Sequence, residues 1–483
     1  MNVGCSVEEF IRDYSKEIIN SNAALFIGSG LSRAAGYTDW KGMLKEVAQD
    51  IGLDVNKETD LISLAEYYVN SKRSREKINK AISEFFSVEH APTETHRILA
   101  SLPITSYWTT NYDKLMERTF KEQDISYSFL TNDKSFQKFV NGSGVVLHKL
   151  HGDVDSPGEA VITRLDYEEF AFRHEMLLAK LKGEMCSKSF LFLGYSFSDT
   201  DIMHILTRIR LFYKDNKAKT HYCILEKLAR KKDEQGKLES DEDFAYRQTK
   251  QEHHILDLKS YGISTVLVDN YKTDIPAILN EIRRRVYIRD VFISGACESN
   301  NESIATYSQY AQTISAWLVT ENFKIHCGYG KNIGADVVAG ADDGCRLSKP
   351  HSLKKLNSCL YIYPFPYKAS LSEIEREKVY DEYRQRIISK TGICIIINGT
   401  KLKNRKIQNS VGILNEAKIA MQNGCLVIPI AVTGGAAKQI WDEMNQQNTA
   451  LTISTNFQKL NSGQSFEEVF SAVKLLLNDY INQ

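Results

Sequence analysis

The first chemically informative segment of the chain is AALFIGSGLS, residues 23–32. It opens with a short apolar run and passes directly into Gly28-Ser29-Gly30 ahead of a predicted helix. A buried strand, a glycine-rich turn and a helix in this order are typical of the first unit of a doubly wound α/β fold. Glycines there let backbone N–H groups approach a pyrophosphate, and a helix N-terminus favours negative charge. Because such turns also occur without a nucleotide, this segment alone does not decide for phosphate binding.

The alternation of strands and helices continues through the first part of the chain. Residues 7–20 carry apolar side chains at helical spacing and predict an amphipathic helix. Short apolar runs bounded by polar residues or glycine predict buried parallel strands at 104–109, 145–150, 190–193, 222–225 and 264–268. The charge-dense segment 225–260 predicts a long helix with a solvated face rather than a binding surface.

The pattern restarts near residue 290. Further strands are predicted at 291–294, 323–327, 358–363, 393–397 and 426–430. Helices are predicted between them at 303–320, 371–391, 408–423 and 466–481. The predicted fold class is therefore α/β, with two Rossmann-like doubly wound domains at residues 1–285 and 289–483.

The composition excludes several broad classes of protein. Across 483 residues, 61 Lys and Arg balance 61 Asp and Glu, which argues against a dedicated nucleic-acid binder. No run approaches the roughly 18 apolar residues that span a bilayer, and residues 1–10 lack the pattern of a signal peptide. Nine cysteines without a C-x-x-C pair disfavour a disulfide framework and a cysteine-rich zinc site. We therefore expect a cytoplasmic protein with no metal, no membrane span and no nucleic-acid partner.

Two more segments carry polar side chains directly after predicted strands. They are TTNYD at 109–113 and LHGD at 150–153, and the carboxyl ends of parallel strands are where such folds bind ligands. The Asn111 amide can hold a ribose hydroxyl or position a water, and His151 can accept a proton from either. Asp113 can orient a loop by accepting backbone N–H groups. Each residue also has a structural interpretation, an Asx turn for Asn111 and a satisfied buried histidine for His151.

Four motifs in this order resemble the sirtuin-like NAD-binding fold: GSGLS (28–32), TTNYD (109–113), LHGD (150–153) and FLGYSFSD (192–199). The resemblance implies that NAD+ binds at the strand ends, with its phosphates near Gly28, Ser29, Gly30 and Ser32. It also implies that Asn111 contacts the nicotinamide ribose and that His151 is the general base. Further implied cofactor-binding positions are Asp113 and, in a late loop near the adenosine side, Tyr195, Ser196 and Asp199.

The sequence departs from protein-deacylating sirtuins in one respect. Those enzymes carry a small zinc module with two Cys pairs, and this chain has none. The departure favours cleavage of NAD+ without an acyl-lysine acceptor. The implied reaction is attack by water at the anomeric carbon of the nicotinamide ribose, through an oxocarbenium-like transition state. An NAD-dependent protein deacylase and a nucleotide-binding scaffold without turnover are the alternatives.

The second half combines small-residue turns with scattered basic residues. The predicted strand 291–294 runs into Gly295, and a glycine-containing segment follows the next predicted strand at 328–334. Arg384 lies on a predicted helix and Lys401 in a predicted basic loop. Such residues suit a phosphorylated or nucleotide-like ligand, although solvated surface charges are the commoner interpretation of each.

This half resembles the SLOG family, a Rossmann-like group related to phosphoribohydrolases that activate cytokinins. Those enzymes carry a Gly-Gly-x-Gly-Thr-x-x-Glu loop, whereas this chain has NSVGILNE at 409–416 and keeps only Gly412 and Glu416. The loss favours a sensor that binds a nucleotide-derived ligand without hydrolysing it, over a phosphoribohydrolase. The positions that match the family's ligand contacts are Ser294, Gly295, Gly328, Tyr329, Arg384, Lys401 and Glu416.

A sirtuin-like domain followed by a SLOG domain resembles the effectors of the Thoeris anti-phage defence system. The resemblance implies an NAD+ glycohydrolase that is activated when a cyclic ADP-ribose-type signal binds the SLOG domain. A partner TIR-domain protein would supply the signal, and cleavage to nicotinamide and ADP-ribose would deplete NAD+ and cause abortive infection. Members of this family assemble as tetramers or larger, so the resemblance also implies a homo-oligomer.

Overall fold

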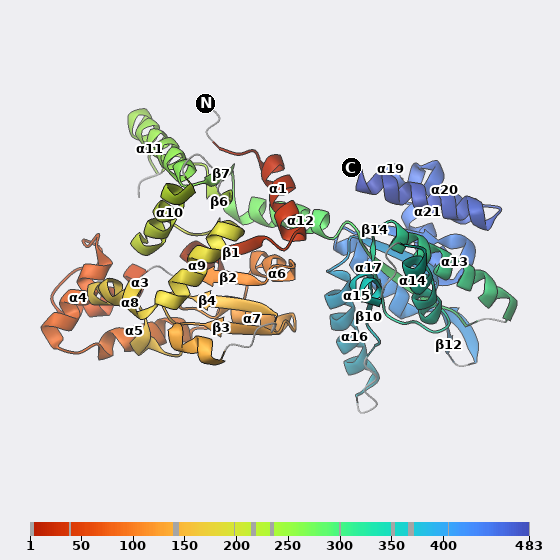
Figure 1. The fold of residues 1–483 in the computed structure, drawn as a ribbon, viewed down its shortest axis with the longest axis horizontal. Helices are drawn as coiled ribbons and strands as arrows, with labels where there is room; N and C mark the ends of the chain where they lie inside the picture. Colours follow the sequence, from red (N-terminus) through yellow and green to blue (C-terminus); the bar gives the residue numbers. More distant parts are fainter. Residues whose placement is uncertain are drawn as a thin grey trace. The chain divides into compact units, whose positions relative to one another are not determined.

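The protein is described by a computed structural model for residues 4–37, 40–138, 144–197, 199–213, 219–231, 236–298, 301–348, 353–365, 371–403 and 405–482. The chain divides into two compact units, Met1–Arg283 and Arg284–Gln483. They follow one another along the sequence, so the first is coloured red to green and the second green to blue in Figure 1.

The first unit is built on one sheet, which has seven strands in the described part of the chain. They are β1 (Ala23–Ile27), β2 (Ser106–Thr109), β3 (Tyr127–Leu130), β4 (Val145–Lys149), β5 (Ser189–Leu193), β6 (His221–Glu226) and β7 (Ile263–Val268). Their order is β3-β4-β2-β1-β5-β6-β7, and all neighbours pair in parallel. The strand order reverses between β1 and β5, which makes this the topological switch point, where doubly wound sheets bind ligands.

Helices connect these strands. They are α1 (Val7–Ile19), α2 (Ser29–Ala35), α3 (Trp40–Asp50), α4 (Leu61–Lys72), α5 (Glu76–Ser87), α6 (Glu94–Ser101), α7 (Leu115–Glu122), α8 (Arg164–Arg173), α9 (Glu175–Ser187), α10 (Thr200–Tyr213), α11 (Asp241–Ser260) and α12 (Tyr271–Val286). Short 3₁₀ turns η1 and η2 cover Asp133–Lys138 and Pro157–Glu159. Helices α3, α4 and α5 gather on one side of the unit in Figure 1 and share a separate apolar core. One member of that core is Tyr112, so the insertion between β1 and β2 packs against the segment that carries Asn111.

The second unit repeats the same architecture on a smaller sheet. Its parallel strands are β8 (Asp290–Ala296), β9 (Lys324–Cys327), β10 (Leu360–Ile362), β11 (Ile393–Asn398) and β14 (Leu426–Ile430). Their order is β10-β9-β8-β11-β14, so the switch point lies between β8 and β11. The two parallel sheets with connecting helices confirm the predicted class of two Rossmann-like doubly wound domains.

The helices of the second unit are α13 (Asn301–Thr320), α14 (Gly334–Leu347), α15 (Leu353–Cys359), α16 (Glu373–Ile388), α17 (Val411–Gln422), α18 (Gly435–Asn445), α19 (Ala450–Ile453), α20 (Thr455–Ser462) and α21 (Phe466–Ile481). A 3₁₀ turn, η3, covers Ala431–Thr433. An antiparallel hairpin of β12 (Thr400–Lys403) and β13 (Lys406–Asn409) leaves the main sheet directly after β11. Strands β11 and β14 are buried along their whole length, because helices cover a sheet of this class on both faces.

Three predicted boundaries in the second unit are wrong. The helix expected over 408–423 begins only at Val411, because residues 408 and 409 belong to β13. The expected basic loop around Lys401 is strand β12, since positive φ angles at Asn398 and Gly399 turn the chain into a hairpin. The strand expected over 358–363 covers only Leu360–Ile362, because its first two residues end helix α15.

Candidate catalytic and ligand-binding sites

Parallel pairing places the polar motifs of the first unit in one row. Thr109 of β2 pairs with Ile27 of β1 and with Lys149 of β4, and Ile27 also pairs with Leu193 of β5. Two positions beyond this paired row the chain carries, in sheet order, His151, Asn111, Ser29 and Tyr195. The four motifs therefore end at the same edge of the sheet, at or beside the switch point.

Asn111 is held by a short chain of hydrogen bonds. Its Nδ2 donates to Ser32 Oγ at 2.9 Å, and that hydroxyl donates to Asp113 Oδ2 at 2.6 Å. The Asn111 backbone N–H donates to Thr109 Oγ1 at 3.0 Å. Asp113 Oδ1 accepts the backbone N–H of Leu115 at 3.0 Å, so this carboxylate orders the start of α7. The Asn111 amide itself faces Ser32 rather than closing an Asx turn.

The cavity beside the Asn111 side chain is very small. It measures about 10 Å³ and is lined by four apolar residues and by the polar residues Ser32, His96, Thr109, Asn111, Asp113 and Glu117. A space of this size holds about one water molecule, far less than a dinucleotide. A dinucleotide therefore does not fit in this cavity, and Asn111 itself is only partly buried.

His151 is paired with a carboxylate from the late loop. Its Nε2 lies 2.9 Å from Asp199 Oδ2, and both side chains are almost fully buried. The rings of Tyr167 and Phe170 meet the imidazole edge-on, with centroids 5.4 and 5.5 Å away. Burial raises the pKa of Asp199, but its electrostatic interaction with the nearby His151 ring outweighs this and leaves the pKa lowered. A carboxylate in this position stabilises an imidazolium, which suits a histidine that accepts a proton.

The glycines of the first turn pack against the late loop. Gly28 N–H donates to the Leu193 carbonyl at 2.8 Å, and Gly30 N–H donates to the Gly194 carbonyl at 2.9 Å. A Cβ added at Gly30 would lie 2.8 Å from Gly194 Cα. The two segments therefore touch backbone to backbone across the switch point, and these two N–H groups already have acceptors within the protein. Ser29 is exposed at the start of α2.

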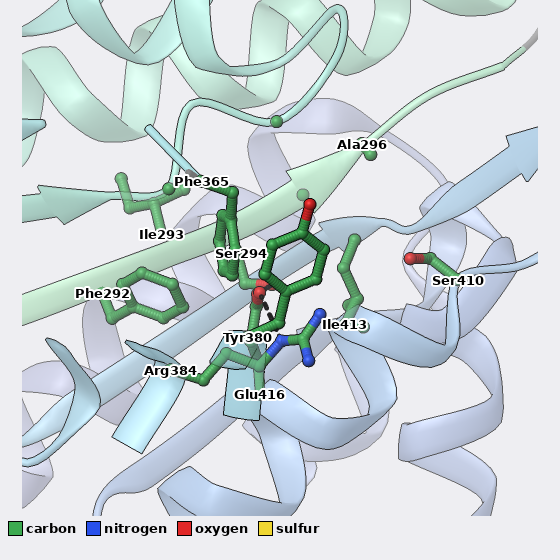
Figure 2. Close-up of a pocket in the computed structure, with 14 residues that line it drawn as sticks. Phe292, Ile293, Ser294, Ala296, Phe365, Tyr380, Arg384, Ser410, Ile413 and Glu416 are labelled. Atoms are coloured by element: carbon green, nitrogen blue, oxygen red, sulfur yellow. Dashed lines mark hydrogen bonds and ion pairs between the residues drawn. The ribbon is translucent and has the colours of Figure 1, made fainter. Parts of the chain in front are cut away.

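The second unit has a more open cavity at its own switch point. It measures about 180 Å³ and is lined by Phe292, Ile293, Ser294, Gly295, Ala296, Gly328, Gly330, Phe365, Tyr380, Arg384, Ser410, Gly412, Ile413 and Glu416. Figure 2 shows that the end of β8 forms one wall, with Arg384 and Glu416 projecting from helices toward Ser294. The lining combines charged groups, aromatic rings and glycines, as small-molecule sites commonly do.

Arg384 and Glu416 form the polar centre of this pocket. Arg384 Nη1 lies 2.7 Å from Asp381 Oδ1 and 3.4 Å from Glu377 Oε2, and its Nε lies 3.6 Å from Glu416 Oε1. Ser294 Oγ donates to Glu416 Oε2 at 2.6 Å. Burial raises the pKa of Glu416, and the Ser294 hydrogen bond and the Arg384 charge oppose that rise only in part. Contacts within the protein thus hold both central side chains, Arg384 and Glu416, in place.

Two aromatic rings flank the guanidinium. The Phe365 centroid lies 5.3 Å and the Tyr380 centroid 5.8 Å from Arg384 Cζ, within the range of cation–π attraction. The two rings meet edge-on at 5.4 Å. Such an aromatic corner offers a flat apolar surface to a base next to a cation that suits a phosphate.

Comparisons with known proteins agree with both halves of the chain. Residues 105–247 match a SIR2-like domain, and residues 274–480 match the Sir2- and TIR-associating SLOG family. A Bacillus cereus (strain MSX-D12) protein named NAD(+) hydrolase ThsA is 36% identical over 453 residues, which cover 92% of this chain and 91% of that protein. A Cytobacillus dafuensis protein of the same name is 37% identical over 440 residues, covering 90% and 88%. The chain belongs to the ThsA family.

A more distant relative of this ThsA family member is the Bacillus subtilis protein named Defense-associated sirtuin 2. It is 21% identical over 218 residues, which cover 44% of this chain and 21% of that protein. Membership of the ThsA family confirms the resemblance to sirtuin-like and SLOG proteins that the motifs indicated.

Most of the ligand-contact positions predicted for the second unit of this ThsA-family chain line one cavity. Five predicted positions line the second pocket, namely Ser294, Gly295, Gly328, Arg384 and Glu416. Tyr329 is half exposed with a positive φ, and Lys401 lies on β12; neither is among the residues that line the cavity. In the first unit, Ser196 is exposed, while Tyr195 is buried against Phe26 with ring centroids 4.7 Å apart.

Sequence reasoning missed several residues of these sites. It named Asp199 as a cofactor-binding position in the late loop but did not anticipate that this carboxylate lies beside His151. It did not single out Phe365 or Tyr380, because isolated aromatic residues in a loop and a helix are far more often packing residues. No sequence signal identified Lys149 as buried, since a lysine at a strand end is usually exposed.

The described residues provide neither a cluster of metal ligands nor a membrane-spanning helix. Among them, no group of three or more His, Cys, Asp or Glu side chains is arranged to hold a metal ion. None of the helices in the described ranges combines the length and apolar character that crossing a membrane requires.

Proposed function

We propose that this protein is an NAD+ glycohydrolase whose sirtuin-like domain, predicted at residues 1–285, carries the active site. The observation that carries the proposal is the row at the sheet edge, where Asn111 and His151 follow neighbouring paired strands and Asp199 backs the histidine. Relatives over nine-tenths of the chain are named NAD(+) hydrolase ThsA, which supports the same substrate. NAD+ acts as the substrate, with its phosphates at Gly28, Ser29, Gly30 and Ser32.

The residues at this edge suit attack by water. The bond between nicotinamide nitrogen and the ribose anomeric carbon breaks, nicotinamide leaves as a neutral base, and the water oxygen joins the anomeric carbon. His151 takes the proton lost by the water, and Asp199 stabilises the resulting imidazolium. Asn111 holds the water or the ribose hydroxyls in line. Nicotinamide is already cationic in NAD+, so its departure needs no general acid.

The closed geometry corresponds to a resting state. The Asn111 amide donates to Ser32 beside a cavity of about 10 Å³, and His151 Nε2 lies 2.9 Å from Asp199 Oδ2. Productive binding requires the amide to exchange Ser32 for the substrate and the late loop, with Tyr195 and Ser196, to move outward. A closed resting state is expected of an enzyme that would otherwise exhaust the NAD+ of its own cell.

The SLOG domain, predicted at residues 289–483, is proposed to be the sensor. Its pocket would bind a cyclic ADP-ribose-type signal made by a TIR-domain partner, a proposal supported by the match to a Sir2- and TIR-associating SLOG family. Phe365 and Tyr380 suit a base, and Arg384 suits a phosphate. Tyr329 and Lys401 would complete the site, since β12 belongs to the hairpin that leads directly into the lining residues of α17.

Ligand binding then activates hydrolysis. A ligand shifts an equilibrium only by its differential affinity for two states, and moving from 1:99 to 99:1 takes about 5.5 kcal/mol. Several subunits of a homo-oligomer, a tetramer or larger, can share this free energy. NAD+ depletion in an infected cell gives the protein its role in anti-phage defence, in line with the name Defense-associated sirtuin 2 of a distant relative.

One assay separates the candidate functions. Nicotinamide release is measured with NAD+ alone, with an added acyl-lysine peptide, and with cyclic ADP-ribose isomers. Release that needs a cyclic isomer and no peptide supports the proposal. Release that depends on the peptide supports a protein deacylase, and an intact NAD+ pool under all conditions supports a scaffold without turnover.

A further inference from the structure

A charged side chain is completely buried next to the catalytic row. Lys149 ends strand β4, two residues before His151, and none of its side chain is exposed. Lysine is almost never fully buried unless it is paired. The described structure supplies the pairing, because four oxygen atoms surround the ammonium group.

These oxygens come from both loops that carry catalytic residues. Lys149 Nζ donates to the Tyr112 and Asp113 carbonyls at 3.2 and 2.6 Å, in the loop that follows Asn111. It also donates to Asp153 Oδ2 at 2.6 Å, in the loop that follows His151. One ammonium group therefore joins the two segments that must hold the amide and the imidazole at a fixed separation.

A third segment anchors this arrangement. Lys149 Nζ lies 2.9 Å from Glu117 Oε1 on helix α7, which is also buried. Lys114 Nζ lies 3.1 Å from Asp153 Oδ1, so a second cation balances the second carboxylate. The ammonium group thus connects the two loops to a helix that packs beneath them.

The electrostatics keep the cluster charged. Burial lowers the pKa of Lys149, but Glu117 and Asp153 outweigh it and the pKa is raised. Burial raises the pKa of Asp153, yet Lys149 and the other donors leave it lowered. The pKa of Glu117 is raised, mainly by burial and against the pull of Lys149. A buried ion cluster of this kind is weak evidence for stability, because well-packed apolar residues of similar volume often stabilise a protein as well or better.

We propose that Lys149 is a positioning residue for the hydrolysis, fixing Asn111 and His151 relative to each other through the loops that follow them. The inference rests on the proposed NAD+ glycohydrolase function. Lys149 donates to the backbone carbonyls of residues 112 and 113 and to the side chain of residue 153, so it acts on Asn111 and His151 through their neighbours. Displacing a catalytic group by about 1 Å costs about 100-fold in rate, so a loosened junction lowers kcat.

The test replaces the cluster without leaving a charge unpaired. Lys149→Met alone leaves two buried carboxylates without their partner and can prevent folding. The triple variant Lys149→Met, Glu117→Gln, Asp153→Asn keeps similar volumes and removes the charges together. We expect it to fold, with kcat for NAD+ lowered about 100-fold and KM changed only a few-fold. A fall in kcat of less than a few-fold, or an effect confined to KM, would overturn the proposal.

A matched control comes from another carboxylate in the same unit, Glu184, which is partly buried. Glu184 accepts Trp108 Nε1–H at 3.1 Å and bonds Ser106 at the opposite, amino end of β2. Glu184→Gln is expected to lower the unfolding temperature while kcat per folded molecule stays unchanged. If both variants lower kcat equally, the effect is general loosening of the unit and the positioning role is wrong.

Amide hydrogen exchange gives a readout that does not depend on activity. In the full-length triple variant, exchange at residues 112–115 and 153–156 is expected to accelerate, while β1 and β5 keep their protection. Unchanged protection of both loops would overturn the positioning role. If wild-type protein releases no nicotinamide with any trigger, the proposed function fails instead, and the exchange experiment still decides whether Lys149 fixes the two loops.

Discussion

The two sheets have the same kind of switch point but use it differently. Between β1 and β5, backbone packs on backbone at Gly30 and Gly194, and the cavity beside Asn111 holds about 10 Å³. Between β8 and β11, a cavity of about 180 Å³ is bordered by Arg384 and Glu416. We call the first edge, which is tightly packed beside the row of polar side chains, the closed edge, and we call the larger cavity of the second sheet, with its polar groups in place, the open pocket.

Under the proposed function, the difference teaches how one architecture serves catalysis in one unit and sensing in the other. The inactive state of an active site is stabilised when its polar side chains hydrogen-bond to one another, as Asn111 and Ser32 do. A sensor gains from a preformed pocket, because less ordering entropy is lost on binding. The same topology thus supplies both, and the side chains that follow each strand decide which.

The largest effect is expected when the proposed general base, His151, is removed from the closed edge. His151→Ala should lower NAD+ hydrolysis about 100- to 10,000-fold, the usual contribution of a positioned general base. Nicotinamide release under full activation is the measurement, with thermal unfolding as the control for folding. Turnover within a few-fold of wild type in a folded variant would remove His151 from the mechanism and leave the closed edge without its assigned role.

The next effect tests the open pocket. Arg384→Ala should raise the concentration of cyclic ADP-ribose needed for half-maximal activation about 10- to 100-fold, as expected for loss of hydrogen bonds to a charged group. Activity at saturating ligand should recover, because the first unit is untouched. Arg346→Ala is the matched control, since Arg346 is exposed and pairs with Asp342 on its own helix. A normal response of the Arg384 variant would show that the sensor pocket lies elsewhere.

A smaller effect probes the backbone contact at the closed switch point. Gly30→Ala should destabilise the first unit by about 1–3 kcal/mol, because the added Cβ has no room beside Gly194. Gly183→Ala is the contrast, since nothing lies within 4 Å of that Cβ and alanine favours the helix α9 by about 0.5–1 kcal/mol. Denaturant unfolding measures both. Equal stability changes would mean that the two segments do not pack as tightly as described.

The smallest effect is a pH dependence in the open pocket. Burial raises the pKa of Glu416 above its ordinary value of 4.5, so the folded state binds this proton more tightly than the unfolded chain. Its contribution to stability is therefore fully present below pH 4.5 and is lost as pH rises through the raised pKa. Glu416→Gln should flatten that part of the curve. Thermal unfolding of both proteins over a pH series gives the comparison, and parallel curves would contradict a raised pKa.

Much of the fold could be predicted from the sequence. Strands β1, β5, β11 and β14 are buried throughout and read as continuous apolar runs, so their patterns were unambiguous. Strand β3 at the sheet edge was missed, because only its last residue is fully buried and its apolar signal is weak. The β12–β13 hairpin was missed because its residues are polar and exposed and its turn depends on backbone angles.

The site could be predicted only where a motif carried it. Asn111 and His151 follow strand ends in recognisable order, so the sequence could indicate them as candidates. Asp199 and Lys149 depend on contacts between loops that lie far apart in the sequence, and neither spacing nor composition encodes such a contact. For the same reason, the closed state of the first switch point and the open pocket of the second required a structure.

The central claim is that the closed edge breaks NAD+ when the open pocket is filled. The most direct measurement follows nicotinamide release by the purified full-length protein, with NAD+ present throughout and cyclic ADP-ribose isomers titrated in. The account predicts slow release alone and a steep, saturable rise with at least one isomer. Release that is equally fast without any isomer, or absent with all of them, would contradict it.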